Sequence, residues 1–303
     1  MYDIIIIGAG TAGLSAAIYG VRAGKKTLVL DGAFYGGQIV NTQSVENYPG
    51  ISNVSGYDFV YGLYTQATEL GAEYKNDRVV AINQLDDCKE VVCESDKYQA
   101  KTIILAMGAN NKKLGVAREA EFTGRGVSYC ATCDGAFYRG MDVAVIGGGN
   151  TALEDALVLS GICNKVYLVH RRDSFRAEEA LVDRARGKDN IEFVTDSTVV
   201  SFLGDNKVTG IKVTNVKTNE EKDINVDGVF VAVGMKPASD IAIDLVDLDE
   251  NGYIVADESC KTSVPGIFVA GDIRTKEVRQ LVTAAADGAI AALGASQYID
   301  ATI

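Results

Sequence analysis

The chain has 303 residues, of which 47% are hydrophobic and 23% are charged, as is typical of a folded globular protein of about two domains. Its 29 basic and 41 acidic residues give a net charge of −12, which repels the phosphates of nucleic acids and of anionic lipids. This balance disfavours nucleic acid and membrane surfaces as partners.

The N-terminus does not have the pattern of a secretory signal. Met1-Tyr2-Asp3 leads into the apolar run from Ile4 to Ile7 with no basic region and no small-residue cleavage site, unlike a secretory signal. No apolar stretch reaches ~18 residues without a charge, which disfavours a transmembrane helix. In such a chain the six cysteines are expected to be reduced, catalytic or metal-bound rather than a disulfide framework.

One pattern occurs twice along the chain: an apolar strand, a glycine-rich turn, a helix and a second strand. The first copy runs from Ile4 through GAGTAG at 8–13 to Asp31, and the second from Val143 through GGGNTA at 147–152 to His170. The glycines permit a tight turn and let the backbone approach a pyrophosphate, and the helix N-terminus attracts the phosphates. A single copy can be an ordinary turn, but two copies of matched length indicate two dinucleotide-binding units.

The residues that end the second strand of each copy predict different ligands. Asp31 can accept hydrogen bonds from ribose hydroxyls, which suits an adenosine without a 2′-phosphate. The other copy ends in HRRDSFR at 170–176, and its three guanidinium groups suit a phosphate dianion, unless the run is only a solvated surface. We therefore expect FAD in the first unit and NADPH in the second.

Three later apolar segments complete the domain prediction: TIILAMG at 102–108, GVFVAVG at 228–234 and GIFVAGD at 266–272. The first and third would join the unit that begins at residue 1, and the middle one the other unit. The expected fold is α/β, with two Rossmann-like dinucleotide-binding domains and the NADPH domain (113–242) inserted into the FAD domain (1–112 and 243–303). The two chain crossings, near 110–116 and 237–244, would form a hinge.

A C-x-x-C pair, Cys130 and Cys133, lies just before the second unit. Such a pair can be redox-active, half of a zinc site, or incidental. Zinc needs four ligands; Cys88 and Cys93 lie outside the usual spacing and His170 is the only histidine, so we expect no metal and favour a redox dithiol. The remaining cysteines are expected to be ordinary thiols: Cys88, Cys93, Cys163 and Cys260.

Asp134 directly follows the second cysteine of this pair. Because the sole histidine belongs to the arginine motif, Asp134 is the available proton donor and acceptor for the dithiol. Partial burial near the sulfurs would raise the pKa of Asp134, as general acid catalysis requires. The alternative is that Asp134 only caps a turn or helix.

Six segments together resemble the bacterial low-molecular-weight thioredoxin reductases: CATCDG at 130–135, GGGNTA at 147–152, HRRDSFRA at 170–177, GGQ at 36–38, ENYPG at 46–50, and GDI at 271–273 with RQ at 279–280. The resemblance covers about residues 3–299 in family order and spacing. It implies a homodimeric cytoplasmic flavoprotein that passes electrons from NADPH through FAD and an internal disulfide to thioredoxin. It also implies that Cys133 contacts the flavin and that Cys130 attacks the partner's disulfide.

The resemblance assigns roles to the residues that match the family's motifs. Those expected to bind FAD are Gly8, Gly10, Thr11, Ala12, Gly13, Asp31, Gly37, Gln38, Asn47, Val79, Gly271, Asp272, Arg279 and Gln280. Those expected to bind NADPH are Gly147, Gly149, Asn150, Thr151, His170, Arg171, Arg172 and Arg176. The chain departs from the family at Met107, within Ala-Met-Gly, and at 114–116, which reads Leu-Gly-Val; both lie near the first crossing and leave the hinge behaviour open.

The dithiol and the expected nicotinamide site share one domain, so both must approach the same flavin ring in turn. We therefore predict that the inserted domain rotates about its two crossings. Other functions remain open: a flavin-dependent dithiol oxidase, a reductase with a glutaredoxin-like or peroxidase partner, or a redox-responsive flavin-binding module. The arginine motif disfavours the oxidase.

Overall fold

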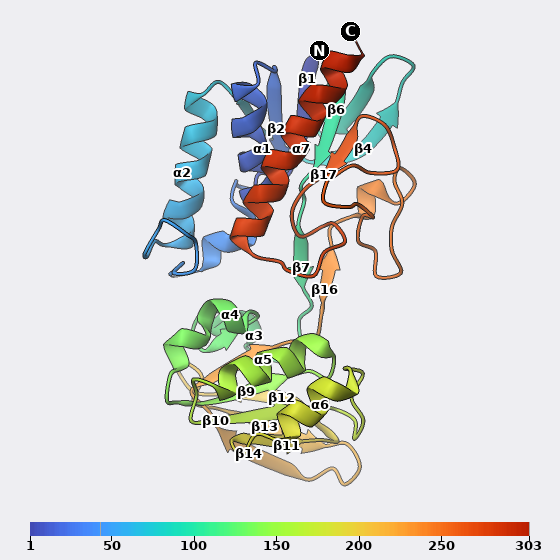
Figure 1. The fold of residues 1–303 in the computed structure, drawn as a ribbon. Helices are drawn as coiled ribbons and strands as arrows, with labels where there is room; N and C mark the ends of the chain where they lie inside the picture. Colours follow the sequence, from blue (N-terminus) through green and yellow to red (C-terminus); the bar gives the residue numbers. More distant parts are fainter. Residues whose placement is uncertain (43, 303) are drawn as a thin grey trace. The chain divides into compact units, whose positions relative to one another are not determined.

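The chain folds into two compact units in the computed structural model, which describes residues 1–42 and 44–302 (Figure 1). Unit 1 consists of Met1–Asn110 and Lys236–Ile303, and unit 2 of Asn111–Met235. Unit 2 is thus inserted into the sequence of unit 1. No helix in the described ranges is both long and apolar enough to cross a membrane.

Unit 1 is built on a seven-stranded sheet in the order β3-β2-β1-β6-β5-β4, with β17 also paired to β6. Its strands are β1 (Tyr2–Ile7), β2 (Thr27–Asp31), β3 (Glu73–Asn76), β4 (Val79–Gln84), β5 (Lys89–Cys93), β6 (Lys97–Leu105) and β17 (Ile267–Val269). Its helices are α1 (Thr11–Arg22), α2 (Gly56–Glu69) and α7 (Leu281–Ala301), with short 3₁₀ turns η1 (Gly37–Asn41) and η3 (Asp240–Ala242).

The apolar run of β1 explains why this sheet is covered on both faces. Ile4 and Ile6 pack into one core with residues of α1 and α7, while Ile5 and Ile7 pack into a second core on the opposite face. Successive side chains of a strand point to opposite faces, so an uninterrupted apolar strand needs two covering layers. Figure 1 shows α1, α2 and α7 side by side along one face of the sheet.

Unit 2 combines a parallel sheet, ordered β11-β10-β9-β15-β8, with an antiparallel sheet, β12-β13-β14. Its strands are β8 (Val127–Ser128), β9 (Asp142–Ile146), β10 (Lys165–Val169), β11 (Ile191–Val194), β12 (Ser197–Leu203), β13 (Gly210–Asn215), β14 (Glu221–Asn225) and β15 (Gly228–Val231). Its helices are α3 (Glu119–Phe122), α4 (Ala131–Asp134), α5 (Asn150–Ser160) and α6 (Glu179–Arg186), with the 3₁₀ turn η2 (Gly135–Tyr138). The crossing segments β7 (Ala109–Asn111) and β16 (Met235–Pro237) pair with each other.

The strand pairings confirm the predicted assignment of the three later apolar segments. β6 and β17 lie side by side in the sheet of unit 1, and β15 pairs with β9 in unit 2. The predicted fold class is therefore confirmed: two Rossmann-like α/β units, one inserted into the other.

A prediction on stability concerns Gly13, which lies in the first turn of α1. A Cβ atom at this position would lie 1.8 Å from the carbonyl oxygen of Gly8, a backbone atom that cannot move away freely. We expect Gly13→Ala to lower the free energy of unfolding by about 3 kcal/mol or more, as overpacking at a rigid contact does.

Gly62 in α2 is the matched control, because a Cβ there would meet nothing within 4 Å. Gly62→Ala should leave the unfolding midpoint unchanged or raise the free energy of unfolding by up to about 1 kcal/mol. Denaturant titration followed by circular dichroism compares the two. Equal midpoints for both variants would contradict the proposed steric role of Gly13.

A second prediction concerns Asp155 in α5. Burial, and then the neighbouring Glu154 carboxylate, raise the pKa of Asp155 to about 7 from 3.8. Between about pH 4 and 7 the unfolded chain binds fewer protons at this residue than the native chain, so this residue's contribution to stability falls as the pH rises. Asp155→Asn should remove that fall, which is on the order of a few kcal/mol.

The measurement is the unfolding free energy of wild type and variant at pH 4.5, 6 and 8. The difference between the two proteins should grow with pH, while the exposed Asp189→Asn control should track wild type. A difference that does not depend on pH would mean that Asp155 titrates normally.

Candidate functional site

The glycine turn of unit 1 connects β1 to α1 and packs closely against the end of β6. A Cβ at Gly8 would lie 2.4 Å from the carbonyl oxygen of Ala106, whereas Gly10 has only the Gly36 oxygen at 3.9 Å. Gly10 is the N-cap of α1, and no side chain caps this helix. The backbone N–H groups of its first turn are therefore available to an anion. The space above Gly10 is the kind that a pyrophosphate needs.

Asp31 ends β2 beside this turn. Its Oδ2 accepts a hydrogen bond from the Ala9 N–H at 2.7 Å, and its Oδ1 accepts one from Ala33 N–H at 2.9 Å. The carboxylate therefore fixes the glycine turn to the end of the strand. Each carboxylate oxygen keeps further acceptor capacity, so the residue can also accept a hydrogen bond from a ribose hydroxyl.

Several other predicted FAD residues gather near the turn or near the start of α7. A Cβ at Gly37 would lie 3.7 Å from the Gly10 Cα, and Gln38 donates a hydrogen bond to the Ala109 oxygen. Asn47 donates to the Gln280 side chain at 3.2 Å. Gln280 is the N-cap of α7 and forms a capping box with Thr283 there. Val79 starts β4, where it pairs with Cys93.

Asp272 follows β17 and carries a buried hydrogen-bond acceptor in unit 1. Its Oδ1 is buried and has no hydrogen-bond partner within the described part of the chain. Burial raises the pKa of Asp272, and the nearby Lys276 and Arg279 oppose this shift. Arg279 also donates to the Asp272 backbone oxygen at 3.3 Å. A buried acceptor without a partner is costly, so a hydroxyl of a bound ligand would stabilise this residue.

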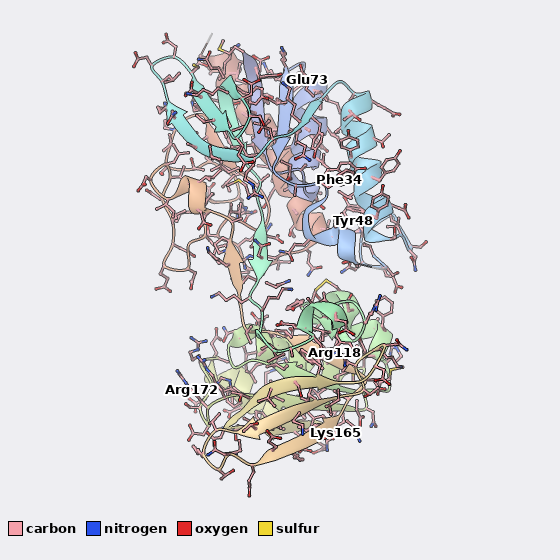
Figure 2. The ribbon with its side chains drawn as sticks, turned by 180° about the vertical axis from the view of Figure 1, so that it is seen from behind. Phe34, Tyr48, Glu73, Arg118, Lys165 and Arg172 are labelled. Atoms are coloured by element: carbon pink, nitrogen blue, oxygen red, sulfur yellow. A yellow bond between two sulfur atoms is a disulfide. The ribbon has the colours of Figure 1, made fainter. Side chains whose placement is uncertain are left out.

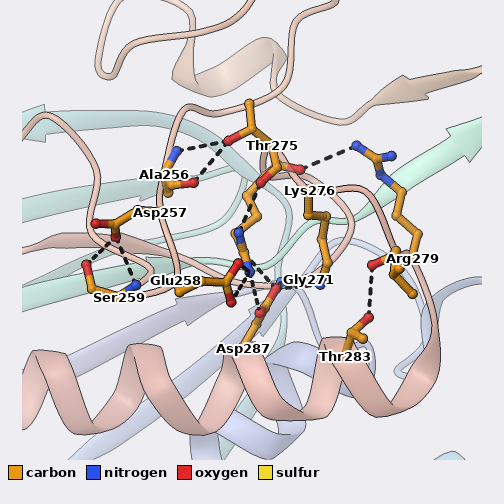
Figure 3. A network of polar contacts seen from close by, with 12 residues as sticks. Ala256, Asp257, Glu258, Ser259, Gly271, Thr275, Lys276, Arg279, Thr283 and Asp287 are labelled. Carbon is orange, nitrogen blue, oxygen red and sulfur yellow. Dashed lines mark hydrogen bonds and ion pairs between the residues drawn. The ribbon is translucent and has the colours of Figure 1, made fainter.

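The structure adds a cluster that the sequence reasoning missed. Asp287 in α7 accepts hydrogen bonds from Arg274 and Lys276 and from the Gly271 N–H (Figure 3). We call Asp287, Arg274 and Lys276 the Asp287 cluster. One signal was present in the sequence: Asp287 is the sole charged residue between positions 281 and 299.

The glycine turn of unit 2 repeats the geometry of unit 1. A Cβ at Gly147 would lie 2.3 Å from the Ala232 oxygen, but Gly149 has no atom within 4 Å. Gly149 is the N-cap of α5, again without a side-chain cap. The helix starts with Asn150 and Thr151. Asn150 exchanges two hydrogen bonds with Glu178, at 3.1 and 2.9 Å, which ties the helix start to the segment that follows the arginine motif.

The arginine motif follows β10 and places three guanidinium groups near one imidazole. Arg171, Arg172 and Arg176 are exposed, and none forms an ion pair with a carboxylate in the described ranges. Figure 2 shows the labelled Arg172 side chain at the surface of unit 2. All three positive charges act on His170, since each of them lowers its pKa, after the larger effect of burial. Such a cluster of uncompensated cations suits a phosphate.

His170 itself makes internal contacts. The residue is 8% exposed. Its ring stacks on Phe175 with the centroids 5.0 Å apart, and its Nε2 lies 3.2 Å from the Ser174 oxygen. A Cβ at Gly148 would lie 2.2 Å from the ring. In the structure, His170 therefore packs beneath the glycine turn and orients the arginine segment.

Cys130 and Cys133 form a disulfide, with Cα atoms 5.3 Å apart (Figure 2). Cys130 is the N-cap of α4, which ends at Asp134. The Ser128 hydroxyl donates to Asp134 Oδ2 at 2.6 Å and accepts from the Cys130 N–H at 3.1 Å. Burial raises the pKa of Asp134, and the Ser128 hydrogen bond opposes this shift. A carboxyl group that holds a proton more strongly than usual is thus placed one residue from the disulfide.

Glu119 is a second residue that the sequence reasoning missed. Its buried carboxylate accepts hydrogen bonds from the Leu114 and Gly115 N–H groups, both at 2.9 Å, and from the Tyr129 hydroxyl at 2.8 Å. The residue before Cys130 is therefore fixed to the segment by which the chain enters unit 2.

The comparisons with known proteins agree with this geometry. A family model described as pyridine nucleotide-disulphide oxidoreductase matches residues 2–288. Thioredoxin reductases of Listeria monocytogenes and Bacillus subtilis are 44% and 42% identical to the chain, over 99% of it and 94% and 95% of their own lengths. The crystal structure of thioredoxin reductase from Streptococcus pyogenes matches with a TM-score of 0.95 and 42% identity, covering 99% of both chains. The chain belongs to the pyridine nucleotide-disulphide oxidoreductase family.

Proposed function

We propose that the protein is an NADPH-dependent thioredoxin reductase that uses FAD and the Cys130–Cys133 disulfide. The observation that carries this proposal is the disulfide beside a half-buried acid, Asp134, in the same unit as the arginine motif. The alignments with the similar thioredoxin reductases cover 99% of the chain, so they extend over both units.

The residues of unit 1 fit FAD. The uncapped start of α1 at Gly10 suits its pyrophosphate, Asp31 its adenosine ribose, and the unpartnered Asp272 oxygen a ribityl hydroxyl. We assign the flavin side to Gly37, Gln38, Asn47, Arg279 and Gln280, and the adenine side to Val79. FAD, when bound, supplies a hydride acceptor that can pass two electrons on to a disulfide.

The residues of unit 2 fit NADPH. The open space at Gly149 and the uncapped start of α5 suit the pyrophosphate, with Asn150 and Thr151 in the first turn of that helix. Arg171, Arg172 and Arg176 suit the 2′-phosphate, which NADH lacks. We assign His170 to this site as the residue on which the arginine segment packs.

Reduction of the disulfide takes up two electrons and two protons and leaves two thiols. Cys130 as a thiolate then attacks a sulfur of the thioredoxin disulfide, which forms a mixed disulfide and releases one thioredoxin thiolate. Cys133 attacks the Cys130 sulfur, which restores the internal disulfide and releases the second thiolate. Asp134 donates and accepts the proton at these sulfurs, because burial raises its pKa toward the working range of a general acid.

Three further parts of the proposal rest on the resemblance of the sequence motifs to the thioredoxin reductase family: the chain works as a homodimer, acts in the cytoplasm, and moves unit 2 as a body between its two half-reactions. The last follows because the disulfide and the NADPH residues belong to one unit and must each reach the same flavin.

The central prediction is that purified protein is yellow, is bleached by NADPH under anaerobic conditions, and regains its colour when oxidised thioredoxin is added.

Cys133→Ser should keep bound FAD but lose thioredoxin reduction, because the dithiol can no longer form. Cys88→Ser, at a partly exposed cysteine outside the disulfide, should keep full turnover. NADPH oxidation with thioredoxin and with oxygen alone is followed at 340 nm. Thioredoxin turnover by the Cys133→Ser variant, or consumption of oxygen in place of thioredoxin, would refute the proposed function.

A second prediction concerns the choice between NADPH and NADH. Arg171→Gln, Arg172→Gln and Arg176→Gln should each lower kcat/KM for NADPH by at least about tenfold, because a charge-assisted hydrogen bond contributes roughly 1.5–3 kcal/mol. The kcat/KM for NADH should change little. Arg184→Gln, at an exposed arginine of α6, is the control and should leave both values unchanged. The variant that combines all three substitutions should show the largest loss. If its ratio of kcat/KM for NADPH to kcat/KM for NADH equals that of wild type, the 2′-phosphate does not bind at these arginines.

A further inference from the structure

The hydroxyl of Ser128 contacts two residues of the redox loop, which comprises residues 129–134. Its Oγ lies 2.6 Å from Asp134 Oδ2 and 3.4 Å from the Cys130 carbonyl oxygen, and it accepts a hydrogen bond from the Cys130 N–H at 3.1 Å. Two acceptors are thus within reach of one hydroxyl proton. The oxygen keeps a second lone pair after it accepts from Cys130. Ser128 is only 6% exposed, so water competes little for these partners.

The position of Ser128 is fixed by the sheet of unit 2. Ser128 is the last residue of β8 and pairs with Phe230 of β15. Cys130 and Asp134 lie beyond this strand, as the N-cap and the last residue of α4. The Ser128 oxygen is therefore a fixed point against which the Asp134 carboxyl group is held.

The contacts of Ser128 can satisfy both protonation states of Asp134. An Asp134 carboxylate only accepts, and the Ser128 hydroxyl donates to it. An Asp134 carboxylic acid has a proton to donate, which Ser128 Oγ can accept while its own proton turns to the Cys130 oxygen. That oxygen also accepts from the Asp134 N–H at 3.1 Å, and a carbonyl oxygen has two lone pairs. Rotation of one hydroxyl group therefore keeps every partner satisfied when Asp134 changes its charge.

We propose that Ser128 is a positioning residue that holds the Asp134 carboxyl group in place in both of its protonation states, by turning its hydroxyl proton between Asp134 Oδ2 and the Cys130 oxygen. This role rests on the proposed function, in which Asp134 is the acid and base at the sulfurs. When Asp134 gives its proton to a thiolate, a thiol and a carboxylate form, and Ser128 becomes the donor. When Asp134 takes the proton back, Ser128 becomes the acceptor. Ser128 keeps its own proton in both directions.

The other titratable groups around Asp134 leave Ser128 as the group that opposes the effect of burial. Burial raises the pKa of Asp134, and the Ser128 hydrogen bond lowers it. Burial, and then Asp134, raise the pKa of Tyr138 in η2 to about 12, so this phenol stays neutral. Helix α5 packs against α4 and carries Glu154 and Asp155, but neither of them shifts the pKa of Asp134. Loss of the Ser128 hydroxyl should therefore raise the pKa of Asp134 further.

The first test is the titration of Asp134 in the oxidised protein with FAD bound, where the disulfide sulfurs do not titrate. Protein labelled with ¹³C at the aspartate carboxyl carbons is followed by NMR from pH 4 to 9, and the Asp134 signal is the one that Asp134→Asn lacks. Ser128→Ala should raise the pKa of Asp134 by about 1 pH unit or more, because a hydrogen bond to a charged group is lost.

Two variants control this titration. Ser128→Thr keeps a hydroxyl and should titrate as wild type does. Ser197→Ala removes an equally buried hydroxyl of unit 2 that donates to the Thr195 backbone oxygen, and it should leave the Asp134 titration unchanged. The pairing of residue 128 with Phe230 is made by the backbone, so Ser128→Ala should fold.

The second test follows the hydroxyl proton itself. Cys130 is the only cysteine that precedes an alanine, so labelling with carbonyl-¹³C cysteine and ¹⁵N alanine identifies the Cys130 carbonyl signal. In wild type this signal should shift with the same pH midpoint as Asp134, since protonation of Asp134 turns the hydroxyl to this oxygen. Ser128→Ala should lose that shift. A Cys130 carbonyl that does not respond to pH in wild type, or equal Asp134 midpoints in wild type and Ser128→Ala, would overturn the inference.

Asp134→Asn separates the role of Ser128 from the proposed function. It should lower kcat with thioredoxin by at least about tenfold and change KM little, because the acid and base at the sulfurs is gone. If Asp134→Asn turns over thioredoxin as fast as wild type does, the mechanism in the proposed function is wrong. If Asp134→Asn is slow while Asp134 titrates alike in wild type and Ser128→Ala, only the role of Ser128 is wrong.

Discussion

The structure depends on one steric constraint, the close packing of each glycine turn against the end of a neighbouring parallel strand. In unit 1 the contact is between Gly8 and the Ala106 oxygen, and in unit 2 between Gly147 and the Ala232 oxygen. Neither contact leaves room for a Cβ, and the first helix of each unit begins shortly after this glycine, at the carboxyl ends of the central strands. The uncapped N–H groups of that helix then lie where open parallel sheets bind ligands.

The two units use this shared backbone for different ligands through the residues that follow the second strand. In unit 1 an acid, Asp31, is bonded to the turn. In unit 2 an imidazole packs beneath Gly148, and the arginines that follow it remain exposed. The helix N-terminus attracts any phosphate, so these neighbours, not the glycines, account for the proposed choice between FAD and NADPH.

Features that depend on local sequence were predictable. The two glycine turns, the disulfide pair and Asp134 lie within short segments, and the helix expected after the first glycine turn is α1. The strand predicted at 102–108 instead spans Lys97–Leu105, because its first half forms an antiparallel hairpin with β5 that an apolar count does not detect.

Contacts between distant segments could not be predicted in the same way. The bond between Asp287 and Gly271 depends on how α7 packs beside the end of β17, and the bonds from Leu114 and Tyr129 to Glu119 depend on how three segments meet. A single buried charge in an apolar helix signals that a partner exists, but not which residue it is. Such side chains contribute to the site by holding turns and charges in place, and that contribution is visible only after folding.

The segment around the disulfide is unusually well fixed for a part of the chain that must react with two different partners. Ser128 joins the Cys130 backbone to Asp134, and Glu119 joins Tyr129 to the Leu114 backbone. Local unfolding of this loop would break these hydrogen bonds and leave the buried Glu119 carboxylate without partners, at a cost of several kcal/mol. Movement of unit 2 as a body breaks none of them. The internal bonding of the redox loop therefore supports the proposed movement of unit 2 as a body over opening of the loop itself.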